Sequence, residues 1–395
     1  MRAKYFTAIF ASLFAGAFSA GACTSWVLRP EVTESGRMII QKVLDVPYRN
    51  RLDADFRVGP NGWRWLRVGS FKNGASMGMN EKGVAITTNC GDRNGEIPSA
   101  DRDRLSVSSY GVVWLVKSCA TAEEAVAALK HIGRNRFFVY GLKNYGTIAL
   151  VADAHRAFLV EIGDGYCEVS EIASGIHVVS NNWDLPGGET VSEAALSPTR
   201  GNRARKTCAA RSLQENRVAG KYTLRGCFDT SRKIRKRGFD EHHVFVPGNR
   251  KATNMSLETT CFEIDPEFPA VLSCAYLALG PQRHTVYLPV PMALRQLPDK
   301  IRDGRWGEMA YAHQEAFGPE HGDLPKIVEL EDRFVAEFRA ARDRARELLK
   351  AGKQDEAVEL LNSCFGRQYA EADRLMTALH AAAKSKTAPA KNAKK

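Results

Sequence analysis

The chain has 395 residues and a net charge of +11 at pH 7, and 44% of its residues are hydrophobic. This length suits one large domain, or a domain with an appendage, and is enough to bury a sizeable core. Much of the positive charge is local, at residues 231–237 and 384–395, and neither segment has the interleaved aromatic residues of a single-strand binder. The composition therefore argues against a nucleic-acid partner.

The first 22 residues are typical of a secretory signal peptide. A basic start, MRAK, is followed by one apolar run and then by small residues that include Ala20 and Ala22. The apolar run is too short for a comfortable membrane span, and no later stretch is apolar enough to cross a bilayer. We expect residues 1–22 to be removed before Cys23, which places the mature protein in the periplasm or outside the cell without stable membrane insertion.

From Thr24 to about residue 290 the chain alternates between strand and helix patterns. Strands are predicted at residues 24–30, 37–45, 83–89, 176–182, 256–265, 270–279 and 284–290, with a strand meander at 147–172. Helical spacing predicts two short helices within 108–133 and one polar helix at 199–216. Strands that flank helical segments twice indicate an α+β layered sandwich.

The C-terminal part changes character. Residues 323–352 and 354–384 carry apolar side chains at helical spacing with a glycine between the two segments, which predicts a helical hairpin packed on the main domain. We therefore divide the chain after the signal peptide into a main domain at 23–318, a helical extension at 319–383 and a basic, disordered tail at 384–395.

The pairing of the nine cysteines cannot be derived from their spacing. Export implies an oxidising compartment in which disulfides persist, so eight cysteines could pair and one would be left over. Cys23 is the natural odd one. Buried free thiols are the alternative to a set of disulfides, because they are common in protein cores.

Cys23 gains a second reactive group if cleavage makes it the first residue. A free α-amine has a pKa near ~7.7–8.0 and a cysteine thiol has one near ~8.5. The amine can therefore take the thiol proton at neutral pH without a histidine, which is the simplest form of an activated cysteine nucleophile. The sequence predicts that cleavage before Cys23 creates an active site.

Four short motifs follow one another along the main domain. They are CTSWVL at 23–28, QKVLDVP at 41–47, SMGMNEKGVAITTN at 76–89 and VVSNNWDLPG at 178–187. In this order they resemble motifs of the N-terminal-nucleophile (Ntn) cysteine hydrolases, a superfamily of linear amide hydrolases. Its members include choloylglycine (bile-salt) hydrolases, penicillin V acylases and the penicillin-forming acyltransferase. The resemblance implies a four-layer αββα sandwich and leaves the C-terminal hairpin outside it.

The resemblance also implies roles for individual residues. Cys23 is the expected nucleophile, and Asp45 ends a strand paired with that of Cys23, where it can hold or orient the α-amine. Asn89 and Asn181 each follow an apolar strand and can donate side-chain N–H bonds to the oxyanion of a tetrahedral intermediate. The alternative for each of these three polar residues is an ordinary residue at a strand end or turn.

Two basic positions also match the family. Lys42 stands where bile-salt hydrolases carry arginine, and it could neutralise developing charge or anchor a carboxylate. Because lysine lacks the bidentate fork of arginine, this difference leaves the substrate open. Arg200 and Arg203 lie where the family often has a helix-borne arginine near the site, and Arg203 is our candidate for substrate binding. An exposed helix arginine is the alternative.

We expect neither a metal nor another cofactor. The run Glu241-His242-His243 has no second ligand pair at a suitable spacing, and neither an HExxH nor a CxxC motif occurs. No phosphate-binding loop or dinucleotide fingerprint is present in the sequence either.

Three other functions are alternatives to that of a hydrolase. A cysteine after the small residues of a signal is also the site of bacterial lipid attachment, which would cap both the thiol and the amine. Ala20 stands where such sites usually carry a larger aliphatic residue, and a strand follows Cys23 directly, so both points favour the nucleophile. A binding module that kept the fold without the chemistry is the second alternative. An acyltransferase that forms the same thioester is the third.

The sequence thus predicts a secreted amidohydrolase that cleaves a linear C–N amide bond of a small molecule through a thioester on Cys23. Bile-acid, penicillin-like, fatty-acyl and aminoacyl groups all remain open as the acyl group, and so do small dipeptides. The sequence does not decide whether the protein forms a homo-oligomer.

Overall fold

The computed structural model describes nine segments of the chain. These are residues 23–46, 52–69, 75–93, 116–134, 145–163, 166–185, 200–234, 244–245 and 255–387. The predictions for the signal peptide, for residues 108–115 of the helical stretch, for Glu241 to His243 and for residues 388–395 of the tail lie outside these segments. Within them, no helix is both long and apolar enough to cross a membrane.

Six strands form the first antiparallel sheet, sheet I. In spatial order they are β10 (Ile176–Val179), β1 (Thr24–Leu28), β2 (Met38–Val46), β11 (Met255–Ile264), β12 (Cys274–Leu279) and β13 (Leu288–Pro291). β1 is an internal strand, because Ser25 lies opposite Val179 of β10 on one side and Lys42 of β2 on the other. Both edges of β1 are therefore paired, which fixes the position of Cys23 at its head.

Seven strands form the second antiparallel sheet, sheet II. In both chain and spatial order they are β3 (Asp53–Val58), β4 (Arg64–Gly69), β5 (Met77–Asn80), β6 (Ala85–Arg93), β7 (Tyr145–Ala152), β8 (Ala157–Gly163) and β9 (Tyr166–Glu171). Arg67 of β4 is buried and forms ion pairs with Asp53 at 2.6 Å and Asp55 at 2.7 Å. This charged group lies inside the protein because both of its neighbours on β3 compensate its charge.

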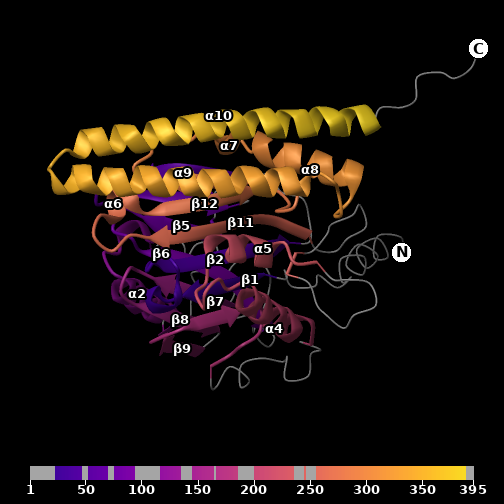
Figure 1. Cartoon of the computed structure of the whole chain (residues 1–395). Helices are drawn as coiled ribbons and strands as arrows, with labels where there is room; N and C mark the ends of the chain where they lie inside the picture. Colours follow the sequence, from indigo (N-terminus) through magenta and orange to yellow (C-terminus); the bar gives the residue numbers. More distant parts are fainter. Residues whose placement is uncertain are drawn as a thin grey trace, which may run out of the picture.

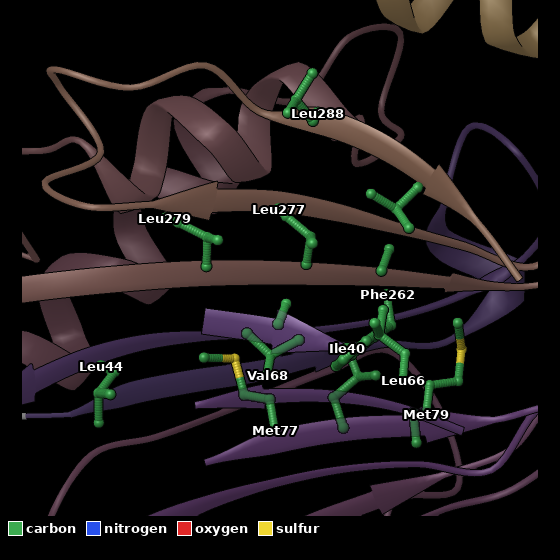
Figure 2. Close-up of a cluster of buried hydrophobic side chains, with 14 of the residues drawn as sticks. Ile40, Leu44, Leu66, Val68, Met77, Met79, Phe262, Leu277, Leu279 and Leu288 are labelled. Carbon is green, nitrogen blue, oxygen red and sulfur yellow. The ribbon is translucent and has the colours of Figure 1, made fainter. Parts of the chain in front are cut away.

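The two sheets pack face to face. Successive side chains of a strand point to opposite faces of its sheet, so Cys23 and Val27 join the core between the sheets while Trp26 and Leu28 face the other way. Figure 2 shows part of this core, in which side chains from β2, β11 and β12 meet those from β4 and β5. Cys23 is thus part of the layer where the two sheets meet.

Helices cover the outer face of each sheet and the edges formed by β3 and β13 (Figure 1). They are α2 (Ala122–Arg134), α4 (Arg200–Glu215), α5 (Leu224–Ser231), α6 (Pro269–Leu272), α7 (Asp299–Arg302), α8 (Arg305–Phe317), α9 (Leu324–Lys350) and α10 (Gln354–Thr387), with one 3-10 turn, η1, at Pro30–Val32. The apolar face of α2 packs on sheet II, whereas α4, α5, α9 and α10 contribute to the core outside sheet I.

The helices α9 and α10 form a long hairpin on the side of sheet I, at the top of Figure 1. Buried ion pairs fasten α9 to the main domain. Arg342 pairs with Glu263 of β11, and Arg232, just after α5, pairs with Glu331 of α9 at 2.6 Å. Loss of one partner of a buried pair typically costs about 3–5 kcal/mol, because the other charge stays buried without compensation. The hairpin is therefore part of the folded unit.

The predicted α+β class and the C-terminal hairpin are confirmed. α10 continues to Thr387, so residues 384–387 of the expected tail are helical. Strands β3, β4 and β5 are not predicted from the sequence. In β3 and β4 the ion-paired residues Asp53, Asp55 and Arg67 interrupt the apolar alternation that marks a half-buried strand.

Candidate active site

Cys23 lies at the head of β1 and is 3% exposed. Its Sγ is 3.8 Å from the backbone oxygen of Asp45 in the neighbouring strand β2. Ser180, just after β10, donates a 3.0 Å hydrogen bond from its hydroxyl to the carbonyl oxygen of Cys23. Contacts from β2 and from the residue after β10 thus fix the position of Cys23.

Asp45 is fully buried at the end of β2. Its Oδ1 accepts a 2.5 Å hydrogen bond from the Ser256 hydroxyl, and its Oδ2 has no hydrogen-bond partner among the described residues. Burial raises the pKa of Asp45 to about 7. The charge of Arg205 is the largest effect that opposes this rise, ahead of the Ser256 hydrogen bond. A carboxylate with one oxygen still to be bonded can accept from an ammonium group at the head of β1.

The helix α4 brings Arg205 to the same place. Arg205 is 8% exposed, and its guanidinium interacts electrostatically with both Asp45 and Cys23. Burial lowers the pKa of Arg205, and these two acidic groups oppose that shift. Arg203, which we expected at this position, is exposed on α4 instead. The helix-borne arginine of the site is therefore present, two residues further along the chain, and the side chain of Arg200 is not described.

Asn89 and Asn181 join the two sheets beside Cys23. Asn89 of β6 donates from Nδ2 to the backbone oxygen of Ser180 at 3.1 Å, and Asn181 donates from Nδ2 to the backbone oxygen of Cys90 at 2.6 Å. Each side chain therefore forms a hydrogen bond from its own sheet to the backbone of the opposite sheet or of the segment that follows it. A carboxamide has two N–H groups, so each asparagine retains one that these bonds do not use.

Lys42 is also placed between the sheets, where it is 1% exposed. Its Nζ donates to the backbone oxygen of Thr88 in β6. Ser25, opposite Lys42 on β1, donates a 2.8 Å hydrogen bond from its hydroxyl to Oδ1 of Asn89. The charge of Lys42 acts on the buried carboxyl of Asp45. Lys42 thus helps to fix the geometry of sheet I against sheet II at the site.

Trp183 packs closely against β6 in the same region. A Cβ atom on Gly91 would lie 2.7 Å from Cη2 of the Trp183 ring, closer than real contacts allow. Glycine at this position therefore lets the indole lie flush against the strand, two residues after Asn89. This contact orders the segment after β10 that carries Asn181.

All nine cysteines are described, and none of them forms a disulfide. Of the two alternatives left by the sequence, the structure thus has thiols rather than four disulfides. Most of them are buried in the cores, and Cys23 is the one beside Asp45 and Arg205.

The structure brings five of the six predicted site residues together where β1, β2, β6 and the segment after β10 meet. They are Cys23, Lys42, Asp45, Asn89 and Asn181. The sequence analysis missed Arg205, Ser180 and Ser256. The spacing of Arg205 with Ala209 and Leu213, which are both buried on one side of α4, was the available signal for the first of these.

No protein-family profile matches the chain, and no curated protein is similar to it in sequence. Solved structures do resemble it. Two variants of conjugated bile acid hydrolase from Clostridium perfringens are each 14% identical, with TM-scores of 0.43 and 0.46. They cover 64% and 68% of this chain, and 88% and 92% of their own chains.

Penicillin V acylase from Agrobacterium tumefaciens is likewise 14% identical, with a TM-score of 0.37, and the match covers 65% of this chain and 86% of that one. The chain is therefore similar to solved structures of conjugated bile acid hydrolase and penicillin V acylase, at a level of likeness that assigns no reaction.

Proposed function

We propose that this protein is a hydrolase of linear C–N amide bonds in which Cys23 is the nucleophile. The observation that carries the proposal is the position of Cys23 at the head of an internal strand, beside Asp45 and Arg205. The proposal includes export of the chain and removal of residues 1–22, because only then does Cys23 have a free α-amine. The compartment is the periplasm or the exterior of the cell.

In the proposed mechanism the thiol of Cys23 attacks the carbonyl carbon of the substrate amide. The α-amine takes the thiol proton and passes it to the leaving amine, while Oδ2 of Asp45 holds the ammonium form. The remaining side-chain N–H groups of Asn89 and Asn181 stabilise the oxyanion, each worth ~10²–10³ in rate. Water, activated by the same amine, then releases the acyl group from the thioester.

The burial of Cys23 argues against the lipoprotein alternative. A diacylglyceryl group on Sγ would have to leave a position that is 3% exposed and lies between β2 and β10. The mass of the mature N-terminus distinguishes the two cases. Hydrolysis is preferred to acyl transfer because water is abundant outside the cytoplasm, whereas activated acyl donors such as acyl-coenzyme A are scarce there.

The test is a panel of small amides that differ in their acyl group. We expect at least one of a bile-acid conjugate, penicillin V, a fatty-acyl amide and a dipeptide to be cleaved to acid and amine. Acid quenching during turnover should trap a thioester, seen by mass spectrometry on the peptide that begins with Cys23. Acylation of a different cysteine would contradict the proposal. Tight binding without turnover would point to a binding module, and faster capture by an added amine than by water would point to an acyltransferase.

A matched pair of variants separates the chemistry of Asp45 from its burial. Burial raises the pKa of Glu258 to about 7, as it does for Asp45, and Glu258 is fully buried on β11. The carboxyl groups of Asp45 and Glu258 therefore bind their protons more tightly in the folded protein than in the unfolded chain. This contribution to stability is therefore complete below pH ~4 and is lost as the pH rises through about 7.

The unfolding free energy of the wild type should fall as the pH rises from about 4 to 7. We expect Asp45→Asn and Glu258→Gln each to make this fall less steep, by up to about 1 kcal/mol per pH unit. Only Asp45→Asn should also lower kcat/KM, by about 10²-fold or more, because only Asp45 lies beside Cys23. Denaturant titrations between pH 4 and 8 and amide turnover measure the two effects. Full activity of Asp45→Asn would remove this residue from the mechanism.

A further inference from the structure

Three histidines that are far apart in the sequence meet next to the C-terminal helices. His284 lies in the connection between β12 and β13, His313 is on α8, and His321 is in the connection from α8 to α9. Each offers a ring nitrogen, and these three atoms lie within 4.8 Å of one another. His284 and His313 are fully buried, and His321 is half-buried. Imidazole nitrogens grouped in this way are a donor set typical of divalent transition metals.

The spacing of the rings is close to that of ligands on one ion. A Zn–N distance of about 2.0–2.1 Å puts the ring centroids of two tetrahedral imidazole ligands about 5 Å apart. The centroid distance is 5.1 Å for His284 and His313, and 4.8 Å for His313 and His321. His284 and His321 are stacked at 4.2 Å, so this pair would open by roughly 1 Å around the ion.

Hydrogen bonds fix the tautomer of the His321 ring. Nε2 of His321 lies 2.6 Å from the backbone oxygen of Arg283, which can only accept, so Nε2 carries the proton and Nδ1 has the lone pair. The backbone N–H of Asp323 donates to this Nδ1 over 3.3 Å, so an ion bound at Nδ1 would replace that hydrogen bond. Nε2 of His313 lies 3.3 Å from Oδ2 of Asp323. Metal-binding histidines usually donate their second N–H to a carboxylate or a backbone oxygen. The His321 contact follows this pattern. Nε2 of His313 makes no hydrogen bond among the described residues, but Asp323 lies close enough to accept one after a small rotation of its carboxylate.

His284 contributes its Nδ1 atom as the third possible ligand. Its Nδ1 is 2.9 Å from Nδ1 of His313, while its Nε2 is buried without a hydrogen-bond partner among the described residues. Without an ion, one of these two Nδ1 atoms must donate to the other. With an ion, both present their lone pairs to it, and the ring of His284 can place its remaining N–H at Nε2.

The charges that face the cluster are mixed. Arg283 and Arg232 act on His284, but Arg232 is bonded to both carboxylate oxygens of Glu331, at 2.8 Å and 2.6 Å. Asp323 and Lys386 act on His313 with opposite signs.

We propose that His284, His313 and His321 bind one divalent transition-metal ion, with Zn²⁺ as the reference ion, and that Asp323 orients His313. The ion joins the β12–β13 connection, α8 and the start of α9, and so fastens the C-terminal helices to sheet I. The site is separate from Cys23 and does not depend on the reaction there. The sequence shows no motif for it, because its ligands come from three separate segments of the chain.

The test is metal binding by the purified, chelator-treated protein. We expect one Zn²⁺ per chain in calorimetric titration and metal analysis, and a rise in Tm of roughly 5 °C when free Zn²⁺ is 100-fold above Kd. Co²⁺ in place of Zn²⁺ should give a spectrum without thiolate charge-transfer bands, which excludes binding by the nine cysteines.

Three variants decide the outcome. His313→Gln should lose saturable binding and the rise in Tm, whereas His155→Gln, an exposed histidine in the β7–β8 turn, should keep both. Asp323→Asn should retain one ion per chain with an affinity about 10–100-fold lower. Because Asp323 is partly exposed, this variant also serves if His313→Gln does not fold. The proposal is wrong if the wild type shows no saturable binding, or if neither His313→Gln nor Asp323→Asn changes it.

Discussion

Replacement of Cys23 by alanine is expected to abolish amide turnover, with a loss in kcat/KM of about 10⁴-fold or more. The reason is that covalent catalysis needs a nucleophile at this place, and the other groups beside it, Asp45 and Arg205, cannot form a thioester. Cys23→Ser should keep only a trace of activity, because a serine hydroxyl is a far weaker acid than a thiol and the amine deprotonates it poorly.

The matched control is Cys167→Ala, which removes a half-buried thiol from β9 in sheet II. This variant should retain wild-type turnover and form the trapped thioester. Near-ultraviolet circular dichroism and thermal unfolding would establish that Cys23→Ala is folded. Turnover by a folded Cys23→Ala protein within tenfold of wild type would end the proposal that Cys23 is the nucleophile.

A chain that retains Ala22 before Cys23 is expected to lose amide turnover by at least about 10²-fold, because its α-amine has become an amide and cannot act as a base. The two forms to compare begin at Cys23 and at Ala22, and are otherwise identical. The measurement is the release of amine from the best substrate of the panel. Both chains should have the same Tm, since the thiol and the strand after it are unchanged.

Alkylation of the thiol adds a second readout for the same pair. The form that begins at Cys23 should react with iodoacetamide faster near neutral pH, because a neighbouring amine assists loss of the thiol proton. Equal turnover by both forms would show that the α-amine has no part in the reaction. In that case, Cys23 would have to depend on another base.

The sequence predicts the parts of the site that follow from strand order. Cys23 and Asp45 belong to consecutive strands joined by the connection at 29–37, which contains η1, so their proximity follows from one antiparallel pair. Asn89 and Asn181 are on different sheets, and their place beside Cys23 depends on how the sheets stack. The sequence supports them through the motif resemblance, and strand patterns alone would not bring them together.

The rotation of α4 about its axis is a feature that the sequence does not predict. The helix is polar along most of its length, so its buried side is weakly marked. Arg205, Ala209 and Leu213 recur at intervals of four residues and face sheet I, which turns Arg203 to the solvent. Packing against β1 and β10 sets this rotation, and a single residue in the wrong register moves a side chain by about 100°.

The internal position of β1 has a consequence for how activity is lost. A residue at a frayed terminus or in a loop can lose its place while the rest of the protein stays folded. Cys23 begins a strand whose two partners, β2 and β10, are separated by more than a hundred residues of chain, so its local opening requires the sheet to come apart. The two paired neighbours of β1 therefore hold Cys23 in place, and we expect the fraction of active sites to follow the fraction of folded molecules.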